Sequence, residues 1–370
     1  MTRLEEVLVK EKRLHRLMEE LGLQGILLKK QPNFSWFTAG GLNMVGMATE
    51  MGVTSLLITR KGRYVIANTI EANRMMQEEG LSELGFELLT HEWYLDREAE
   101  LVTGVVGDLA EGGADTGFAG TRNLDGEIKR LRYSLTPAEI ERYLFLGEKL
   151  SAALEKVIFN DLRPGDKESE VAGRLSAELW RERIDPTAFM VAADERAFLY
   201  RHPIPTQKKI EKYVMICVNA RYKGLITTVT RLVHFGPPPP ELLRQMEDNV
   251  EIECRMIAAT KPGALAADVF QVAVRAYQEL GYGDEWQKHH QGGAMGYYAR
   301  DTRVTAATKE PVEENQAYCW NPSISGTKSE DGFIATSTGP IFITKPLRYP
   351  RIEKTVGGIT FAKAGLLVLP

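Results

Sequence analysis

The C-terminal half of the sequence contains an internal repeat. Arg-Pro-Gly at 163–165 precedes a segment with apolar residues at helical spacing, and Lys-Pro-Gly at 261–263 precedes a similar segment about a hundred residues later. Apolar residues at this spacing form one face of a helix, and repeated units bury such faces against each other. The repeat therefore predicts two halves that are related by a pseudo-twofold axis and surround one central cavity.

Each copy of the repeat also contains a histidine and a Cys-x-Asn signature on an apolar strand. The first copy has His202 and Ile-Cys-Val-Asn at 216–219, and the second has His290 and Tyr-Cys-Trp-Asn at 318–321. A pseudo-twofold arrangement places both strands and both histidines around the central cavity. We therefore expect the functional residues of the chain to lie there.

The first 130 residues show a different pattern, in which helix and strand signals alternate. Short apolar runs bounded by Gly, Pro or Lys-Gly are typical of strands, and two of them flank a predicted hairpin turn. The expected helices are 5–21, 71–79 and 97–109, and the expected strands are 25–28, 54–59 and 64–67. A capping box at 136–139 starts a further helix to about residue 160. These signals predict an α/β domain over 1–130 and a second domain over 131–370.

Composition excludes several classes of protein. The chain has 370 residues with 46 basic and 50 acidic side chains, so it lacks the basic excess that nucleic-acid binding requires. Its apolar runs are far shorter than the roughly 20 residues of a membrane helix, and its charged first residues do not resemble a signal peptide. The 3 cysteines show no Cys-x-x-Cys spacing, which argues against a disulfide framework or a zinc ribbon. We expect a cytoplasmic protein with no membrane or nucleic-acid partner.

The motifs on this repeat resemble those of the pita-bread superfamily, which contains aminopeptidase P, prolidase, methionine aminopeptidase and the non-metal hydrolase creatinase. In the C-terminal half the similar segments are, in family order, 202–206, 224–231, 261–263, 290–293 and 329–332. The stretch 33–40 is similar to a turn in the N-terminal domain of creatinase and prolidase. The resemblance covers nearly the whole chain. It implies a creatinase/prolidase-type α/β N-terminal domain and an α+β pita-bread C-terminal domain with an internal pseudo-twofold.

The resemblance also implies a site for two divalent metal ions, and here the sequence departs from the family. The family's peptidases hold the ions with two Asp, one His and two Glu, since hard dications prefer anionic oxygen ligands. The matching positions hold, in chain order, Cys217, Thr228, Ala294, Asn321 and Glu330. Because a single carboxylate cannot hold a two-metal cluster, we expect no metal ion and no other cofactor.

His202 is the first candidate for catalysis. Its segment is similar to the one that carries the catalytic histidine of creatinase, and to one with a substrate-contacting histidine in aminopeptidase P. A neutral imidazole in a desolvated pocket can take a proton from water and return it to a leaving nitrogen. The alternative is a loop or capping histidine before Pro203.

His290, the second catalytic candidate, precedes a glycine-rich turn where the backbone can approach a ligand closely. Its family position lines the substrate pocket. His289 is expected to point outward, since successive residues of an extended segment face opposite ways. Arg300 matches pocket-lining positions of relatives and could clamp a carboxylate through its guanidinium. A surface ion pair with Asp301 is the alternative for Arg300.

The two cavity cysteines allow more than one interpretation. A thiolate at Cys217 or Cys319 beside a histidine could act as a nucleophile or a soft zinc ligand. A buried cysteine, however, is commonly only a small apolar residue.

The remaining candidates are assigned to substrate binding. Asn321 could donate to a developing oxyanion or to a carboxylate, and it joins Arg300, Glu330, Cys217 and Thr228 in this set. Glu330 is also the expected ion-pair partner of Arg231, because a guanidinium buried on a strand requires an anion.

Three functions are compatible with these residues. The first is a creatinase-like, metal-independent hydrolase of a C–N bond in a small amide, amidine or peptide-like substrate, with His202 as general acid/base. The second is a catalytically inactive pseudopeptidase that binds a peptide or metabolite. The third is an Xaa-Pro metalloaminopeptidase or dipeptidase. The expected partner is a small-molecule or short-peptide substrate, and the resemblance implies a homodimer.

Overall fold

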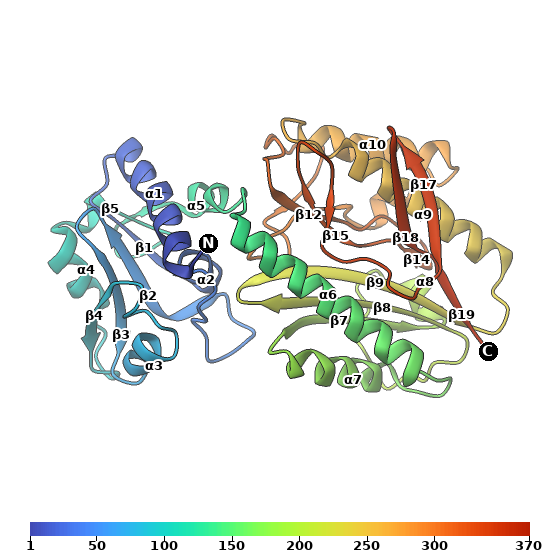
Figure 1. Ribbon diagram of the computed structural model, residues 1–370, viewed down its shortest axis with the longest axis horizontal. Coiled ribbons are helices and arrows are strands. Elements are labelled where there is room, and N and C mark those ends of the chain that lie inside the picture. The colour runs from blue at the N-terminus through green and yellow to red at the C-terminus, as the bar shows by residue number, and fades with distance from the viewer. The chain divides into compact units, whose positions relative to one another are not determined.

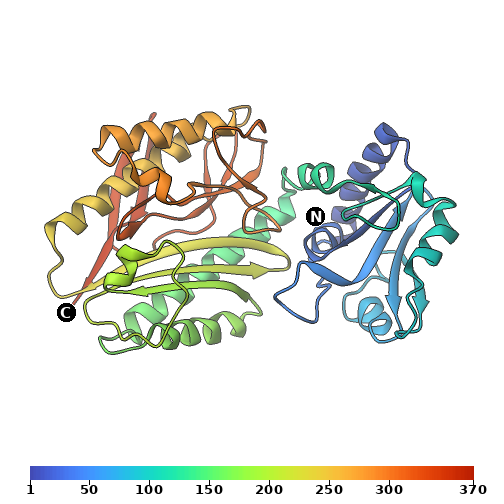
Figure 2. The same ribbon diagram turned by 180° about the vertical axis from the view of Figure 1, so that it is seen from behind.

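The computed structural model describes residues 1–370, which divide into two compact units (Figures 1 and 2). The first unit is Met1–Ile140 with Lys223–Leu225, and the second is Glu141–Tyr222 with Ile226–Pro370. The division falls after residue 140 rather than 130, because the start of α6 (Pro137–Asn160) is tied to the first unit. There a carboxylate oxygen of Glu139 lies 2.8 Å from Nζ of Lys10, and both side chains are buried.

The first unit is built on a mixed six-stranded sheet in the order β4-β3-β2-β1-β5-β6. Its strands are β1 (Gly25–Lys30), β2 (Met51–Thr59), β3 (Arg63–Asn68), β4 (Phe86–His91), β5 (Gly112–Ala114) and β6 (Arg122–Asn123). Its helices are α1 (Arg3–Leu21), α2 (Gln31–Phe37), α3 (Ala72–Gln77), α4 (Glu98–Val106), the 3₁₀ helix η1 (Leu109–Glu111) and α5 (Asp125–Leu131). The predicted hairpin is present, because β2 and β3 pair in antiparallel fashion around the turn.

The ends of α1 follow from its flanking residues. Thr2 caps the first turn through a reciprocal pair of hydrogen bonds with Glu5, which satisfies backbone N–H groups that have no partner inside the helix. The helix stops at Gly22, whose φ of 68° is the left-handed conformation that glycine adopts without strain.

The second unit contains two larger sheets, a four-stranded one in the order β19-β9-β8-β7 and a five-stranded one in the order β11-β10-β12-β15-β16. Its strands are β7 (Asp185–Ala193), β8 (Tyr213–Tyr222), β9 (Leu225–Phe235), β10 (Gly292–Ala294), β11 (Thr302–Arg303), β12 (Gln316–Trp320), β13 (Ser323–Ile324), β14 (Thr327–Lys328), β15 (Gly332–Ala335), β16 (Ile341–Phe342), β17 (Arg351–Val356), β18 (Ile359–Ala364) and β19 (Leu366–Leu369).

Helices cover both sheets of the second unit. Beyond α6 they are α7 (Glu168–Arg181), α8 (Glu195–Leu199), α9 (Pro240–Ala259), α10 (Ala266–Glu279) and the 3₁₀ helix η2 (Glu285–Lys288). In Figure 1, α6 crosses in front of β8 and β9, and Figure 2 shows it behind them. No helix combines the length and the apolar character that crossing a membrane requires.

The internal repeat is visible in the backbone. Gly165 has a φ of 93° and donates its N–H to the Ile210 carbonyl at 2.7 Å, and the helix that follows is α7. Gly263 has a φ of 87° and donates its N–H to the Val312 carbonyl at 2.8 Å, and the helix that follows is α10. The same turn therefore starts both halves, as the pseudo-twofold requires.

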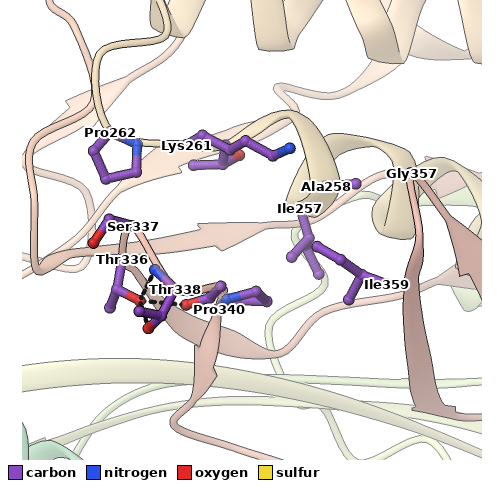
Figure 3. Close-up of a pocket in the computed structure, with 12 residues that line it drawn as sticks. Ile257, Ala258, Lys261, Pro262, Thr336, Ser337, Thr338, Pro340, Gly357 and Ile359 are labelled. Atoms are coloured by element: carbon purple, nitrogen blue, oxygen red, sulfur yellow. Dashed lines mark hydrogen bonds between the residues drawn. The ribbon is translucent and has the colours of Figure 1, made fainter.

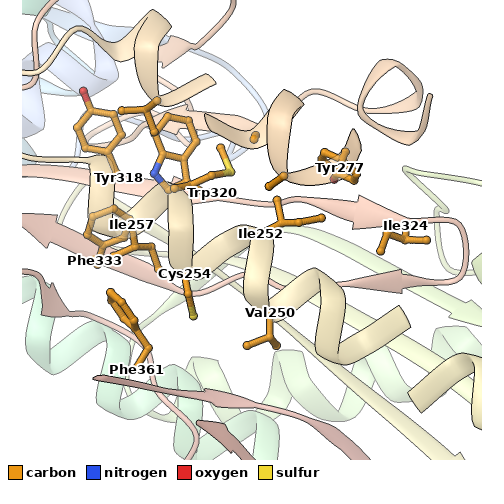
Figure 4. Packing of buried hydrophobic residues seen from close by; sticks show 14 of the residues in the cluster. Val250, Ile252, Cys254, Ile257, Tyr277, Tyr318, Trp320, Ile324, Phe333 and Phe361 are labelled. Atoms are coloured by element: carbon orange, nitrogen blue, oxygen red, sulfur yellow. The ribbon is translucent and has the colours of Figure 1, made fainter. Parts of the chain in front are cut away.

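A large apolar core lies between α9, α10 and the five-stranded sheet (Figure 4). Trp320 and Tyr318 of β12 pack there, and the Trp320 indole N–H donates to Oγ1 of Thr260 at 2.9 Å. Each large side chain buried in this way contributes roughly 1.5–3 kcal/mol. The core holds β12 in place, and the segment that follows β12 carries Asn321 and Ser323.

Candidate active site

Glu330 lies in the segment between β14 and β15 and faces β8 and β9. Its backbone carbonyl accepts the Thr230 N–H at 3.1 Å, so this segment is attached to β9. Its carboxylate accepts hydrogen bonds from Oγ1 of Thr230 at 2.6 Å and from Sγ of Cys217 at 3.2 Å. The strand pair thus brings Cys217 and Glu330 together, as expected for a shared cavity.

Two basic side chains also contact this carboxylate. Nζ of Lys328 lies 2.7 Å from one oxygen of Glu330, and Nη2 of Arg300 lies 3.1 Å from the other. All three side chains are buried or nearly so, with exposed fractions of 5%, 13% and 1% for Lys328, Arg300 and Glu330. One anion shared by two cations leaves a net positive charge at this place.

The protonation states follow from these contacts. Burial alone would raise the pKa of Glu330, but Lys328 and Arg300 outweigh burial and hold the pKa well below its usual range. Burial, together with the nearby Glu330 charge, raises the pKa of the Cys217 thiol to about 11. At neutral pH Glu330 is therefore ionised, and Cys217 is a neutral thiol that lacks the reactivity of a thiolate.

The residues at the five ligand positions do not fit the two divalent ions of the pita-bread peptidases. Ala294 offers no donor atom, Cys217 keeps its proton, and Thr228 and Asn321 offer neutral oxygens. The only carboxylate, Glu330, is already neutralised by two side-chain cations. A hard dication prefers anionic oxygens. Here it would meet the ammonium group of Lys328 and the guanidinium group of Arg300 instead.

Three histidines converge close to this ion-paired group. His202 follows α8, His289 follows η2, and His290 lies two residues before the start of β10. Nε2 of His202 lies 3.1 Å from Nε2 of His289, and the His289 and His290 ring centroids are 4.4 Å apart. One ligand-type atom from each ring lies within 4.8 Å of the others.

The hydrogen bonds of the cluster are compatible with one arrangement of protons that leaves a basic nitrogen on His202. Nδ1 of His289 lies 3.4 Å from Oγ of Ser323, and Nδ1 of His290 accepts the Gly292 N–H at 3.2 Å. If His289 donates from Nδ1 to Ser323, its Nε2 accepts the proton of His202 Nε2, and His202 keeps a lone pair on Nδ1. His290 then carries its proton on Nε2, where it can donate.

All three imidazoles are held in the neutral form. Burial and then the Lys328 charge lower the pKa of His202, and they lower the pKa of His289 to about 2. Burial and then Arg300 lower the pKa of His290 to about 3. Neutral imidazoles at neutral pH can accept a proton, as general-base catalysis requires.

The histidines line a cavity of about 430 Å³. Its wall also includes the basic side chains of Arg201, Lys288 and Arg303 and the aromatic rings of Phe270 and Trp286. The volume of about 430 Å³ lies within the range of small-molecule binding sites.

A second cavity, of about 410 Å³, lies between Lys261, the loop 336–340 and β18 (Figure 3). Lys261 is its one titratable lining residue, and Oγ1 of Thr336 bonds to Oγ1 of Thr338 at 3.1 Å. Acid–base chemistry therefore has its candidates in the histidine cavity and not here.

The structure groups the predicted site residues in two places. His202 and His290 lie in the histidine cluster, whereas Cys217 and Arg300 contact Glu330. Two further predicted residues, Thr228 and Asn321, are only 2% exposed, and their side-chain oxygens have no hydrogen-bond partner.

Two expectations about neighbouring residues were wrong. His289 does not point outward: it is only 7% exposed, because its two ring nitrogens face His202 and Ser323. Arg231 pairs with Asp331 at 3.0 Å and not with Glu330. The reason is strand alternation, which directs Thr230 towards Glu330 and the next residue to the opposite face.

Sequence reasoning missed Lys328, Ser323 and Arg303. Lys328 could have been found, because it stands two residues before Glu330 in an extended segment and so shares its face. Ser323 and Arg303 carry no such local signal, since long-range packing brings them to the histidines.

The fold and the site define a two-domain pita-bread chain with three clustered histidines near an ion-paired Glu330. Residues 145–357 match the model of metallopeptidase family M24, and this is more than half of the chain. The protein therefore belongs to metallopeptidase family M24, a family of hydrolases. The resemblance seen in the sequence and the fold expected from it are confirmed.

Individual relatives agree with this membership. An Xaa-Pro dipeptidase of Pyrococcus furiosus is 24% identical in an alignment of 349 residues that covers 91% of this chain and 97% of the relative. The structure of an Xaa-Pro dipeptidase from Bacillus anthracis is similar with a TM-score of 0.77 at 21% identity, covering 98% of this chain and 100% of that one. The N-terminal domain of a FACT complex subunit from Cicer arietinum (chickpea) is similar with a TM-score of 0.69 at 13% identity, covering 93% and 97%.

Proposed function

We propose that the protein hydrolyses a C–N bond in a small amide, amidine or peptide-like substrate without a metal ion or other cofactor, and that His202 is the general acid/base. One observation carries the proposal. Glu330, the one carboxylate among the five positions matched to the family's metal ligands, is ion-paired with Lys328 and Arg300, while three neutral imidazoles line a cavity.

The proposed reaction uses a water molecule as the nucleophile. Nδ1 of His202 takes one proton of the water while its oxygen bonds to the substrate carbon, and His290 donates a hydrogen bond from Nε2 to the developing oxyanion. The imidazolium of His202 then gives the proton to the leaving nitrogen as the C–N bond breaks. An amide or peptide substrate gives a carboxylic acid and an amine, and an amidine substrate gives a carboxamide and an amine, so that one water is consumed for each bond broken.

The other residues contribute by position and charge. The positive charge that Lys328 and Arg300 leave beside Glu330 favours a substrate carboxylate or the oxyanion. Cys217, Thr228 and Asn321 shape the buried end of the site. The names of the relatives, Xaa-Pro dipeptidases, favour the peptide-like member of the proposed substrates.

The test compares His202→Ala with the unmodified protein on Xaa-Pro dipeptides and their N-acetylated forms. We expect kcat/KM to fall by about 10²–10⁴-fold, the usual contribution of a general acid/base. His15→Ala is the matched control, because His15 belongs to α1 of the first unit. Unchanged turnover in the His202 variant would contradict the proposal.

A second candidate, an Xaa-Pro metallodipeptidase, is favoured by the family membership and by the relatives' names. It predicts that Mn²⁺, Co²⁺ or Zn²⁺ binds at a fixed ratio to the chain and restores activity after chelation. Binding of two ions per chain would support this candidate, and failure to bind them would exclude it.

A third candidate is a pseudopeptidase that binds a peptide or metabolite and cleaves nothing. It is favoured by the likeness to the FACT subunit domain, at the level of the fold. It predicts saturable peptide binding with no cleavage product after long incubation, which chromatography of the mixture detects.

Two further proposals concern the protein as a whole. We propose a homodimer, which light scattering of the purified protein measures. We also propose a cytoplasmic location, which fractionation of the source cells measures.

A further inference from the structure

The cavity beside the histidines is lined by basic and neutral side chains and by no acidic one. Its charged lining residues are Arg201, Lys288 and Arg303. The imidazoles of the three histidines are neutral, and they add polarity without negative charge. A ligand in this cavity therefore meets a positive potential.

The carboxylates that contact these residues are already neutralised. Glu285 accepts from Arg201 at 2.7 Å, from Lys288 at 2.6 Å and from the Ser325 N–H at 2.9 Å. Glu330 is shared by Lys328 and Arg300. Neither carboxylate is left to bind a cationic group of a substrate.

Arg303 is the basic residue best placed to bind an anion. Arg201 and Lys288 share Glu285, whereas Arg303 is exposed on β11, where it pairs through its backbone with Gly293 of β10. The Arg303 charge contributes to lowering the pKa of both His202 and His290, and Arg303 also lines the cavity itself. A guanidinium in this position presents a planar pair of donors to a carboxylate.

Part of the wall is apolar. The rings of Phe270 and Trp286 pack edge to face with centroids 5.7 Å apart, and Val304 follows Arg303 in the lining. Such a wall suits an acyl or ring group of a substrate.

The charge pattern discriminates between two kinds of peptide-like substrate. A free dipeptide is a zwitterion, and its ammonium group would meet the basic lining residues Arg201, Lys288 and Arg303 with no acidic lining residue as partner. An N-acylated amino acid or dipeptide has the same carboxylate and a neutral acyl group in place of the ammonium. The cost of placing like charges together is several kcal/mol at an interface.

We infer that the site selects net-anionic, N-acylated amino acids or peptides, with the substrate carboxylate on Arg303 and the acyl group against Phe270 and Trp286. The inference rests on the proposed function and names its substrate class. The reaction is the hydrolysis already described, in which water is consumed, the acyl–nitrogen bond breaks and the amine takes up the proton.

The test measures binding and turnover of three matched probes with the full chain, in buffer containing a chelator. The probes are N-acetyl-alanyl-proline, alanyl-proline and alanyl-proline amide, which carry a net negative, zero and positive charge at neutral pH. Calorimetry gives Kd and chromatography gives the products. We expect the acetylated probe to bind at least tenfold more tightly than the zwitterion, and the amide to bind most weakly.

Arg303→Gln should weaken binding of the acetylated probe about fivefold to tenfold, the loss of about one partly exposed charge pair. Arg303→Lys should recover part of that loss. Arg244→Gln is the matched control, because Arg244 is an exposed residue of α9 paired with Glu241. The control should bind all three probes as the unmodified protein does.

The outcomes separate this inference from the proposed function. Tighter binding of the zwitterion, or no binding of any probe, overturns the inference. Cleavage of the zwitterion alone overturns the inference and leaves the proposed function standing. Selective binding of the acetylated probe without cleavage of any probe supports the inference and overturns the proposed function.

Discussion

The group around Glu330 and the histidine cluster are neighbours in the second unit, yet they differ in almost every physical property. Around Glu330, two cations, one carboxylate, a hydroxyl and a thiol satisfy one another in a buried place. In the histidine cluster, three neutral rings line a cavity of about 430 Å³. The first region is closed by its own ion pairs, and the second is available to a ligand.

The proposed function implies a metallopeptidase fold that has lost its metal ions and kept its cavity, and this difference supplies a physical reason for it. Removing four of the family's ligands leaves one buried carboxylate, and a lone buried charge is costly unless it is paired. Lys328 and Arg300 supply that pairing. Under the proposed function, the positions matched to the family's ligands then have a structural role, and the acid–base candidates are the residues on the cavity side.

The largest effect on stability is expected from Glu330→Gln. The variant leaves Lys328 and Arg300 buried without a counter-charge, so the free energy of unfolding should fall by about 3–5 kcal/mol. Urea titration measures this change, with Glu241→Gln on the surface of α9 as the control. A loss below about 1 kcal/mol would show that the group is not the ion-paired structural unit described here.

Lys328→Met should have a smaller effect. Arg300 still neutralises Glu330 in this variant, and the methionine side chain fills the space of the lysine stem. We expect a loss of about 1–3 kcal/mol, within the usual range for a core substitution. A loss equal to that of Glu330→Gln would mean that Arg300 contributes nothing to the pairing.

The pH dependence of stability should report the neutral histidines. The folded-state pKa of His289 is lowered to about 2. At a pH below the ordinary pKa of histidine, the unfolded chain therefore binds more protons than the folded chain. Stability is therefore fully present above about pH 6.5 and falls as the pH is lowered. Between pH 6 and pH 5, above the range where carboxylates titrate, His289→Gln should reduce the slope by about 1 kcal/mol per pH unit. Equal slopes in variant and parent would contradict the neutral cluster.

Cys217→Ser should have the smallest effect. The serine hydroxyl can replace the hydrogen bond that the thiol gives to Glu330, so the free energy of unfolding should change by less than about 1 kcal/mol. Because burial raises the pKa of Cys217 to about 11 and of Cys254 to about 12, iodoacetamide should leave the thiols of the folded protein unmodified. Rapid alkylation at Cys217 would favour a nucleophilic cysteine instead.

Much of the fold could be predicted from local signals. The two Pro-Gly turns predict the repeat because glycine at a positive φ is a property of the turn itself. The capping box at 136–139 likewise predicts where α6 begins.

The electrostatics of the site could not be predicted in the same way. The sequence offered Arg231 as the partner of Glu330, and only the register of the segment after β14 against β9 assigns Arg231 to Asp331 instead. His289 is buried because Ser323 and His202, both distant in sequence, surround its ring. Such pairings depend on tertiary packing, which a local pattern does not encode.

The central claim is that the cavity works without the family's metal pair. The most direct measurement is turnover of N-acetyl-alanyl-proline by protein dialysed against a chelator, with the metal content of the same sample determined by elemental analysis. The account predicts less than about 0.1 metal ion per chain and full activity, which added Mn²⁺ or Co²⁺ does not increase. Activity that disappears with the metal and returns at two ions per chain would contradict it.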